Sequence, residues 1–379
     1  MRIAINTRLL LPGKMDGIGW FTFETTRRMV AAHPEHQFIL LFDRPTRQSD
    51  DKDYQALLAA PDVEKVVLCP QARHPVLWWL FFELAVPAAI RRHKADLYLT
   101  PDGMMPLHPK VPTLSVIHDL NFEHSKDNLR ASHQRYMTSF FPRFARAATR
   151  IATVSEYSKQ DIAATYGIDP ERIDVVYDGA HSHYRPHTDV EKQAVRQRFT
   201  GGAPYIIFIS TILKRKNLAN LLRAFDMVKA QLPTLKLVVV GSRVWWQDEL
   251  KDAYDSMIYS DDVVMLGHAN PTDLAALLSA SEMLVYPSYF EGFGIPILEA
   301  MYAETAVVCS RTTSMPEVGG DAVLYVDPAS PEDMARTIVK ACEPAIREDL
   351  IARGRRQRTL FSWERTANLL WQSIMKVER

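Results

Sequence analysis

Glu291 and Glu299 are separated by seven residues and enclose a glycine-rich segment that has the features of a helix start. The apolar, β-prone residues 283–286 stop at a proline, which predicts the end of a strand. Pro296 is tolerated only in the first turn of a helix, so we expect a helix to begin near Gly294 or Ile295. The first carboxylate then precedes this helix and the second lies inside it.

The start of this helix has the chemistry of a phosphate site. The first N–H groups of a helix lack intrahelical partners and lie at the positive end of its dipole, so the amides of Phe293, Gly294 and Ile295 would face an anion. Gly292 and Gly294 also let a ligand approach the backbone closely. Ionised carboxylates only accept hydrogen bonds, so the two glutamates suit the hydroxyls of a hexose and a ribose. The segment predicts a sugar-nucleotide site; the alternative is a turn with two solvated glutamates.

The basic pair Arg215-Lys216 follows a predicted strand, 206–209, and precedes a helix predicted from about Asn217. Ligands of open α/β sheets bind at the carboxyl ends of the strands, which is where this pair would lie. A departing diphosphate carries charge that cations must neutralise, and both side chains bind phosphate oxygens. We expect the pair to hold a diphosphate; a solvated basic loop is the alternative.

These motifs resemble those of the retaining glycosyltransferases of family 4. Residues 287–301 resemble the family's E-x7-E signature. Four further segments resemble family segments in the expected order, namely 116–120, 153–159, 210–218 and 314–321. The resemblance runs over nearly the whole chain. It implies the α/β fold called GT-B, with two Rossmann-like domains, a cleft between them and a C-terminal helix that crosses back to the N-terminal domain.

The resemblance also implies roles for single residues. The catalytic set that it implies is His118, Arg215, Lys216 and Glu291, and the donor-binding set includes Phe293, Gly294, Ile295 and Glu299. His118 would contact a hexose hydroxyl, and Asp119 would either orient it or cap the next segment. Glu291 would hold the hexose hydroxyls and Glu299 the ribose.

Two short motifs could also bind a nucleotide or a metal. Gly17 and Gly19 lie between the first predicted strand and a helix expected from about Trp20, so we add them to the donor-binding set, their amides facing the diphosphate or the acceptor. The third glycine of a dinucleotide fingerprint is missing, which argues against NAD. Asp51-Lys52-Asp53 spells a D-x-D metal pattern, but its charged neighbours favour a surface loop. We predict no metal and no other cofactor.

Two positions depart from the family pattern. The basic loop has Ser210, Leu213 and Lys214 where the family more often has Gly, Glu and Pro, and Lys214 would add a phosphate contact. Glu304 stands where the family commonly has glycine. Because a Cβ disfavours a left-handed turn, we expect the helix that carries Glu299 to end differently here.

Size and composition fit a two-domain enzyme. The chain has 379 residues, and its 45 basic and 45 acidic side chains give no net charge that selects for nucleic acid. Three widely spaced cysteines supply neither a disulfide framework nor a C-x-x-C motif, and no secretion signal begins the chain, so we predict a cytoplasmic location. Residues 76–90 are too short for a membrane span. We expect an amphipathic helix packed on the sheet; the alternative is a helix that lies on lipid headgroups, a peripheral membrane contact at the inner face.

Short apolar runs alternate with helical patterns, the rhythm of parallel α/β sheets. Strands are predicted at 3–5, 38–42, 63–68, 97–99, 114–117 and 151–154, and again at 206–209, 235–240, 263–266, 283–286, 307–309 and 322–326. A polar segment, 177–187, links the two halves. The predicted parts are an N-terminal acceptor-binding domain (1–186), a C-terminal nucleotide-sugar domain (187–360) and a final helix (361–379), whose Trp371 packs on the first domain as the resemblance implies.

Our first hypothesis is a retaining glycosyltransferase. It would move a hexose, with GDP-mannose as a candidate donor, to a glycan or a lipid-linked acceptor. A sugar-nucleotide epimerase of the same general fold is the second hypothesis, and it would convert the donor without an acceptor. A non-catalytic nucleotide-binding subunit is the third, and the presence of all the implied catalytic residues argues against it.

Overall fold

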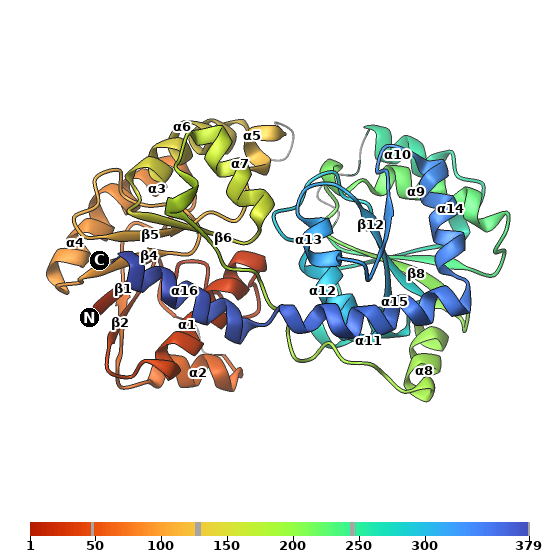
Figure 1. Cartoon of the computed structure of the whole chain (residues 1–379), viewed down its shortest axis with the longest axis horizontal. Helices are drawn as coiled ribbons and strands as arrows, with labels where there is room; N and C mark the ends of the chain where they lie inside the picture. Colours follow the sequence, from red (N-terminus) through yellow and green to blue (C-terminus); the bar gives the residue numbers. More distant parts are fainter. Residues whose placement is uncertain (47–48, 126–129, 243–245, 247, 378–379) are drawn as a thin grey trace. The chain divides into compact units, whose positions relative to one another are not determined.

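The computed structural model describes residues 1–46, 49–125, 130–242, 246 and 248–377 (Figure 1). Contacts divide the chain into two units. The first contains Met1–Asp178 and the C-terminal helix α16 (Trp363–Val377), and the second is Gly179–Ser362. The sequence placed the first boundary after residue 186. The segment 179–186 belongs to the second unit because Tyr184 is buried there and the amide of His187 donates to Ser279 Oγ, 2.9 Å away.

The first unit is built on a parallel sheet of seven strands in the order β3-β2-β1-β4-β5-β6-β7. Its strands are β1 (Arg2–Asn6), β2 (Gln37–Phe42), β3 (Val63–Val67), β4 (Leu97–Thr100), β5 (Thr113–Val116), β6 (Arg150–Thr153) and β7 (Ile173–Val175). The sequence predicted the first six and missed β7. This edge strand has only three residues, so it shows too little alternation to be recognised.

Helices cover the first sheet. They are α1 (Gly17–Ala32), α2 (Lys52–Ala59), α3 (Pro75–Leu80), η1 (Phe81–Ala85), α4 (Val86–Arg92), α5 (Asn121–His124), α6 (Ala131–Ala147), α7 (Glu156–Tyr166) and η2 (Pro170–Arg172). The predicted helix over 76–90 is thus three consecutive pieces, because η1 is a π-helical turn between two α-helices. One face of it buries Trp78, Phe81, Phe82 and Val86 in the core.

Helix α16 lies beside α1 in the first unit (Figure 1). The ring of Trp371 stacks on His33 with 3.7 Å between centroids, and Trp363 meets Phe21 at 6.3 Å. Arg28 of α1 also pairs with Glu364 of α16 at 2.7 Å. These contacts hold the last helix to the first one in the chain.

The second unit has a parallel sheet of six strands in the order β10-β9-β8-β11-β12-β13. Its strands are β8 (Tyr205–Ile209), β9 (Lys236–Val240), β10 (Val263–Gly267), β11 (Met283–Tyr286), β12 (Ala306–Ser310) and β13 (Leu324–Val326), all of them predicted. Its helices are α8 (Asp189–Thr200), η3 (Lys214–Lys216), α9 (Leu218–Lys229), α10 (Asp248–Asp255), η4 (Ser260–Asp262), α11 (Pro271–Ala280), α12 (Ile295–Tyr302), α13 (Met315–Gly319), α14 (Pro331–Ala341), α15 (Pro344–Gln357) and η5 (Arg358–Leu360).

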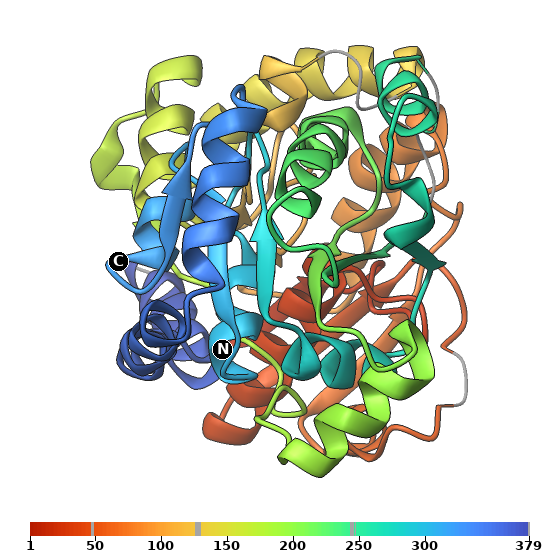
Figure 2. The same cartoon turned by 90° about the vertical axis from the view of Figure 1, so that its right-hand side faces the viewer.

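Strands β8 and β11 are hydrogen-bonded neighbours at the centre of the second sheet, so the loops that follow them leave the same edge side by side. Helices α9 and α14 pack together over one face of this sheet (Figures 1 and 2). Phe208, Phe225 and Ile338 lie in the apolar cluster between helices and strands. The core therefore fixes the positions of the two loops that carry the basic pair and Glu291.

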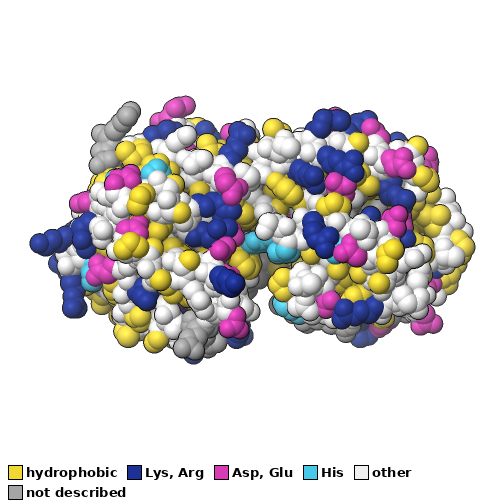
Figure 3. Space-filling view, turned by 90° about the horizontal axis from the view of Figure 1, so that it is seen from below, with side chains coloured by type: hydrophobic (Ala, Val, Ile, Leu, Met, Phe, Trp, Pro, Cys, Tyr) yellow, Lys and Arg dark blue, Asp and Glu magenta, His cyan; other side chains and the backbone are white. Residues whose placement is uncertain are grey.

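Charges are mixed on the surface. On the face drawn in Figure 3, basic and acidic side chains are interspersed, in keeping with the equal totals of the chain. None of the helices in the described residues combines the length and hydropathy needed to span a lipid bilayer.

Candidate active site

The loop after β11 and the start of α12 form the predicted phosphate site. Helix α12 begins at Ile295 with Pro296 in its first turn, as predicted, and Gly294 precedes it with a φ of +103°, which favours glycine. Among the described residues, the N–H groups of Gly294 and Ile295 have no hydrogen-bond partner. Ser314 Oγ lies 2.9 Å from the carbonyl oxygens of both Glu291 and Phe293, so its single proton is shared between them and fixes the loop. Two free amides at a helix N-terminus can bind an anion.

The loop after β8 places the basic pair against this loop. Arg215 and Lys216 form the short helix η3, and the backbone amide of Tyr289 donates to the carbonyl of Arg215 at 2.8 Å. Asn217 adopts a left-handed φ of +62°, and its side-chain amide donates to the carbonyl of Pro287 at 3.0 Å. The two loops are therefore joined through backbone and side chain before any ligand binds.

Glu291 pairs with both cations. Its Oε1 lies 2.5 Å from Lys216 Nζ and its Oε2 lies 3.2 Å from Arg215 Nη1. Arg215 Nη1 also donates to the carbonyl of Phe290 at 2.7 Å, and Lys216 Nζ donates to Tyr286 Oη at 2.9 Å. The structure thus brings three of the predicted catalytic residues together in the second unit.

The ion pairs decide the charge state of the cluster. Glu291 is 6% exposed, and burial alone would raise its pKa, but the charges of Lys216 and Arg215 outweigh burial and lower the pKa to about 2. Glu291 is therefore ionised at neutral pH. Burial raises the pKa of Tyr286 well above its usual range, and the charge of Glu291 adds to this effect, so this hydroxyl stays protonated.

Glu299 lies in α12 and is buried, with 8% of its surface exposed. Burial raises its pKa to about 7, and a hydrogen bond from the hydroxyl of Tyr184 opposes that rise. The two carboxylates of the E-x7-E segment therefore differ in charge state. Glu291 is held ionised by cations, and Glu299 is close to its titration midpoint at neutral pH.

His118 follows β5 in the first unit. Its ring forms a T-shaped contact with the ring of Phe21, with 4.9 Å between the ring centroids. Its Nε2 lies 2.9 Å from the carbonyl oxygen of Pro101. A carbonyl cannot donate, so Nε2 carries the proton and Nδ1 is the acceptor. Burial lowers the pKa of His118, so the ring is neutral at pH 7. Asp119 accepts from the amide of Asn121 at 3.0 Å and thereby secures the next segment.

Gly17 and Gly19 lie inside α1, which starts at Gly17 and not near Trp20 as predicted. Asp16 is the N-cap and explains the earlier start, because its Oδ1 accepts from the amide of Gly19 at 3.0 Å. A Cβ on Gly19 would lie 2.9 Å from the carbonyl oxygen of Leu9. The amide of Gly19 is therefore hydrogen-bonded to the N-cap. The absence of a Cβ at this position allows the close packing against the carbonyl of Leu9.

The D-x-D segment has a structural explanation. Asp51 is the N-cap of α2, and its Oδ1 accepts from the amides of Asp53 and Tyr54 at 2.9 and 3.2 Å. The expected surface loop is therefore wrong, because Lys52 and Asp53 already belong to the helix. Within the residues that the structure describes, no three His, Cys, Asp or Glu side chains converge to hold a metal ion.

Comparison with known proteins places the chain in a family. Residues 15–184 match the family model described as Glycosyltransferase Family 4, and residues 189–357 match the model of glycosyl transferases group 1. O-antigen chain mannosyltransferase B of Escherichia coli is 32% identical over 284 residues, which are 73% of this chain and 73% of that protein. The chain belongs to glycosyltransferase family 4. It is a hexosyltransferase.

Two further proteins are similar to this chain over most of its length. O-antigen chain mannosyltransferase RfbU of Salmonella typhimurium is 25% identical over 275 residues, 72% of either chain. The crystal structure of Anabaena HepE in complex with UDP and glucose covers 99% of both chains with a TM-score of 0.73 at 17% identity. This likeness, together with the two parallel sheets, identifies the GT-B fold in this glycosyltransferase.

The departure at Glu304 does not change the end of α12. Glu304 has a φ of +56°, the left-handed conformation that glycine would adopt, so the expected difference is wrong. A residue with a Cβ loses about 1–2 kcal/mol in this conformation. Glu304 also forms ion pairs with Arg355 and Arg358, at 2.5 and 3.7 Å.

Sequence reasoning missed two polar contributions in this glycosyltransferase. One is Tyr184, which is buried in the second unit. The other is Asp102, which accepts from Asn6 Nδ2 at 2.9 Å and from Arg8 Nε at 2.5 Å. This network fixes the loop after β4 that supplies the Pro101 carbonyl to His118. Asn6 directly follows the predicted strand 3–5, and that position was the available signal.

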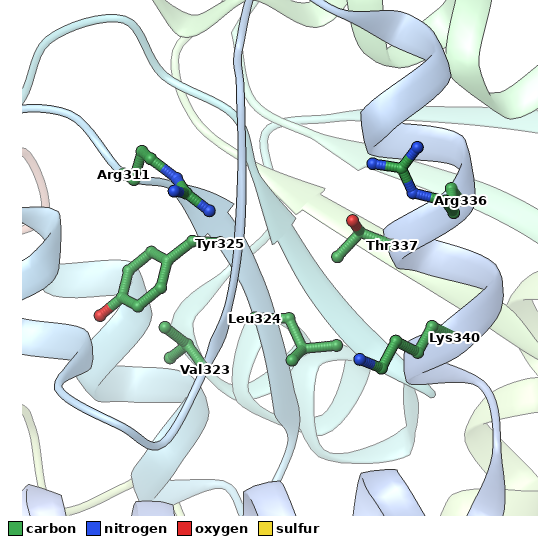
Figure 4. A pocket seen from close by; sticks show the side chains of 7 residues that line it. All are labelled: Arg311, Val323, Leu324, Tyr325, Arg336, Thr337 and Lys340. Carbon is green, nitrogen blue, oxygen red and sulfur yellow. The ribbon is translucent and has the colours of Figure 1, made fainter.

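A surface pocket of about 480 Å³ lies at the outer edge of the second sheet, beside β13. Arg311 and Tyr325 stand on one side of it and Arg336 and Lys340 of α14 on the other, with Leu324 between them (Figure 4). None of the predicted catalytic or donor-binding residues lines it.

Proposed function

We propose that this glycosyltransferase moves a hexose, with mannose favoured, from a nucleotide diphosphate sugar to a glycan or lipid-linked acceptor with retention of configuration. The observation that carries the proposal is the cluster of Glu291, Arg215 and Lys216 beside the free amides at the start of α12. Mannose is supported by the two O-antigen mannosyltransferases. A nucleotide donor is supported by the UDP bound in the HepE structure.

In the proposed reaction the bond between the anomeric carbon and the diphosphate breaks, the acceptor hydroxyl oxygen bonds to that carbon, and the hydroxyl proton passes to the departing diphosphate oxygen. Negative charge then builds on the diphosphate. The amides of Gly294 and Ile295 and the cations Arg215 and Lys216 would stabilise it, and preorganised groups of this kind usually lower the barrier more than any other single effect. No metal is needed for this step in our proposal, because the two cations take its role.

The carboxylates would orient the donor. Glu291 keeps the two cations fixed, and its remaining lone pairs would accept from hexose hydroxyls. Glu299 would accept from the ribose hydroxyls. In the other unit, Nδ1 of the neutral His118 would accept from a further hexose hydroxyl, which requires the Nε2-protonated form that Pro101 imposes.

A donor screen tests the proposal. Purified protein would be mixed with GDP-mannose, UDP-glucose and UDP-galactose, and thermal shift would identify the donor, since a ligand at a hundred times its Kd stabilises by about 2.7 kcal/mol. Transfer to a mannose-containing acceptor would then be followed by mass spectrometry, and the anomer of the product by NMR. Donor conversion that needs no acceptor would favour the epimerase instead. Inverted product would reject retention.

We also propose a cytoplasmic enzyme with peripheral membrane contact through α3 and η1. Val76, Trp79 and Leu84 expose apolar side chains there, and Arg91 and Arg92 follow in the last turn of α4. Apolar side chains beside basic ones suit an anionic lipid surface. Co-sedimentation with vesicles containing phosphatidylglycerol should fall when Trp79 and Leu84 become serine. Equal sedimentation of both proteins would reject the contact.

A further inference from the structure

Tyr286 is the last residue of β11, and its side chain is buried, with 2% of its surface exposed. Its hydroxyl nonetheless has a charged partner, because Lys216 Nζ donates to Tyr286 Oη at 2.9 Å. The ammonium also lies 5.2 Å from the centroid of the tyrosine ring. Strand β11 is hydrogen-bonded to both β8 and β12. A central strand of the second sheet therefore places a hydrogen-bond acceptor at the amine of Lys216.

Lys216 is thus held from two different elements. Glu291 Oε1, in the loop after β11, lies 2.5 Å from Nζ, and Tyr286 Oη holds the same nitrogen from the strand. A free lysine side chain samples many rotamers, so its charge is poorly placed for a fixed anion. The two acceptors differ in charge. The tyrosine hydroxyl is neutral, so it orients the ammonium without cancelling the positive charge that a diphosphate would meet.

We propose that Tyr286 is a positioning residue of the transferase, which holds Lys216 Nζ at the place where the diphosphate departs. This inference rests on the proposed function, since that function gives Lys216 the diphosphate. The tyrosine would act through the lysine and not on the donor, because its own side chain is almost fully buried in the second unit. Phenylalanine at this position would keep the ring and remove the acceptor, so the ammonium would be left to Glu291.

The test compares five proteins: the natural chain, Tyr286→Phe, Lys216→Met, the double variant and Tyr205→Phe. Calorimetry measures the binding of GDP and GMP, and of UDP and UMP, because the members of each pair differ only in the second phosphate. Transfer kinetics on the same preparations give kcat. Tyr205 is the matched control. It is a buried tyrosine of the same sheet, and its hydroxyl donates to the carbonyl of Leu277 at 2.6 Å.

We expect Tyr286→Phe to lower kcat about tenfold, because a hydrogen bond to a charged group is lost. Binding of the preferred nucleoside diphosphate should weaken about tenfold, and that of the matching monophosphate should change less than twofold. In the Lys216→Met background the tyrosine change should cost less than twofold in either quantity. Tyr205→Phe should match the natural chain in both. A lower melting temperature with unchanged kcat and unchanged affinities would show that Tyr286 is only structural.

The outcomes separate the two proposals. If Lys216→Met impairs diphosphate binding and transfer while Tyr286→Phe impairs neither, the positioning role is wrong and the proposed function stands. If none of the nucleotides binds the natural chain, or if Lys216→Met changes neither quantity, the diphosphate role of Lys216 is wrong and that of Tyr286 falls with it. An equal loss from Tyr286→Phe with and without Lys216 would also reject the proposal, because the tyrosine would then act through another group.

Discussion

Lys216 Nζ lies 2.5 Å from Glu291 Oε1, and both side chains are buried. Removing one partner of a buried pair typically costs about 3–5 kcal/mol, because the other charge stays buried and uncompensated. An alanine at either position would therefore lower both stability and catalysis, and an activity assay alone would not tell the two effects apart. Variants that keep the shape of the side chain, and measurements that separate binding from transfer, are needed for this cluster.

Glu291→Gln should separate the two effects. The amide keeps the shape and leaves Arg215 and Lys216 with no neutralising carboxylate, so the cluster gains positive charge. We expect transfer, as kcat/KM, to fall by about 100-fold or more, since the hexose loses a charged acceptor. GDP or UDP should bind at least as tightly as before, because Glu291 no longer competes with the diphosphate for the two cations. Calorimetry and a transfer assay on the same preparation check the two expectations.

Glu304→Gln is the matched control for that variant. It removes a glutamate just after α12 that, like Glu291, pairs with two cations, but one whose partners belong to α15 and η5. Its transfer rate should be unchanged. Weaker nucleotide binding in Glu291→Gln than in this control would contradict the view that Glu291 restrains the cations.

Lys216→Met should impair the chemical step. The methionine keeps the hydrocarbon volume and removes the charge, and we expect kcat to fall about 100- to 1,000-fold, as for the loss of one preorganised group that stabilises developing charge. In the natural chain the pKa of Glu291 is about 2, so its carboxylate stays ionised between pH 5 and 9. Arg198→Met, at an exposed pair with Asp273, serves as the control. A rise in the donor KM with an unchanged kcat would show that Lys216 contributes to donor binding and not to the chemical step.

Much of this site could be predicted because it is local. The spacing of Glu291 and Glu299, the glycines and Pro296 predicted the start of α12 within one residue. The Arg215 loop contacts the Glu291 loop because β8 lies next to β11. The hydrophobic periodicity of a sequence does not determine the order of its strands. Tyr184 is buried only because a polar segment folds back into the second unit. Such contacts come from tertiary packing, which no local pattern encodes.

Glu299 should make stability depend on pH in an unusual direction. Burial raises its pKa from 4.5 to about 7, so between these values the folded chain binds more protons than the unfolded one. Stability from this group is therefore present at low pH and is lost as pH rises through 7. Glu299→Gln should raise the free energy of unfolding at pH 8 by on the order of 3 kcal/mol and change it little at pH 5. Urea denaturation at both pH values measures this.

The same carboxylate then explains why an unfavourable group is kept. If Glu299 holds the ribose, the stabilised variant must bind nucleotide more weakly, which is the exchange of stability for function seen at many active sites. Equal stabilisation at pH 5 and pH 8 would mean that the gain does not come from the buried charge.

Metal chelation should leave the reaction intact, because we assign neutralisation of the diphosphate to Arg215 and Lys216. Transfer after dialysis against EDTA is expected to match that of the untreated protein, and added Mg²⁺ or Mn²⁺ should change it less than twofold. The control is an assay of donor stability under the same conditions. Loss of transfer on chelation and recovery with one metal would move the charge compensation from these side chains to an ion.

His118 should act as a neutral hydrogen-bond acceptor. Its Nε2 proton is held by Pro101, and burial lowers its pKa, so a fall in pH from 8 to 7 should not change its state. Two-bond proton–nitrogen NMR on the imidazole should show the Nε2-protonated tautomer. His118→Ala should lower kcat by about 10- to 100-fold, in the range of one hydrogen bond to the reacting sugar. His124→Ala, at an exposed pair with Asp161, is the control. An imidazolium signal at pH 7, or the Nδ1-protonated tautomer, would reject this role, since neither form leaves Nδ1 able to accept.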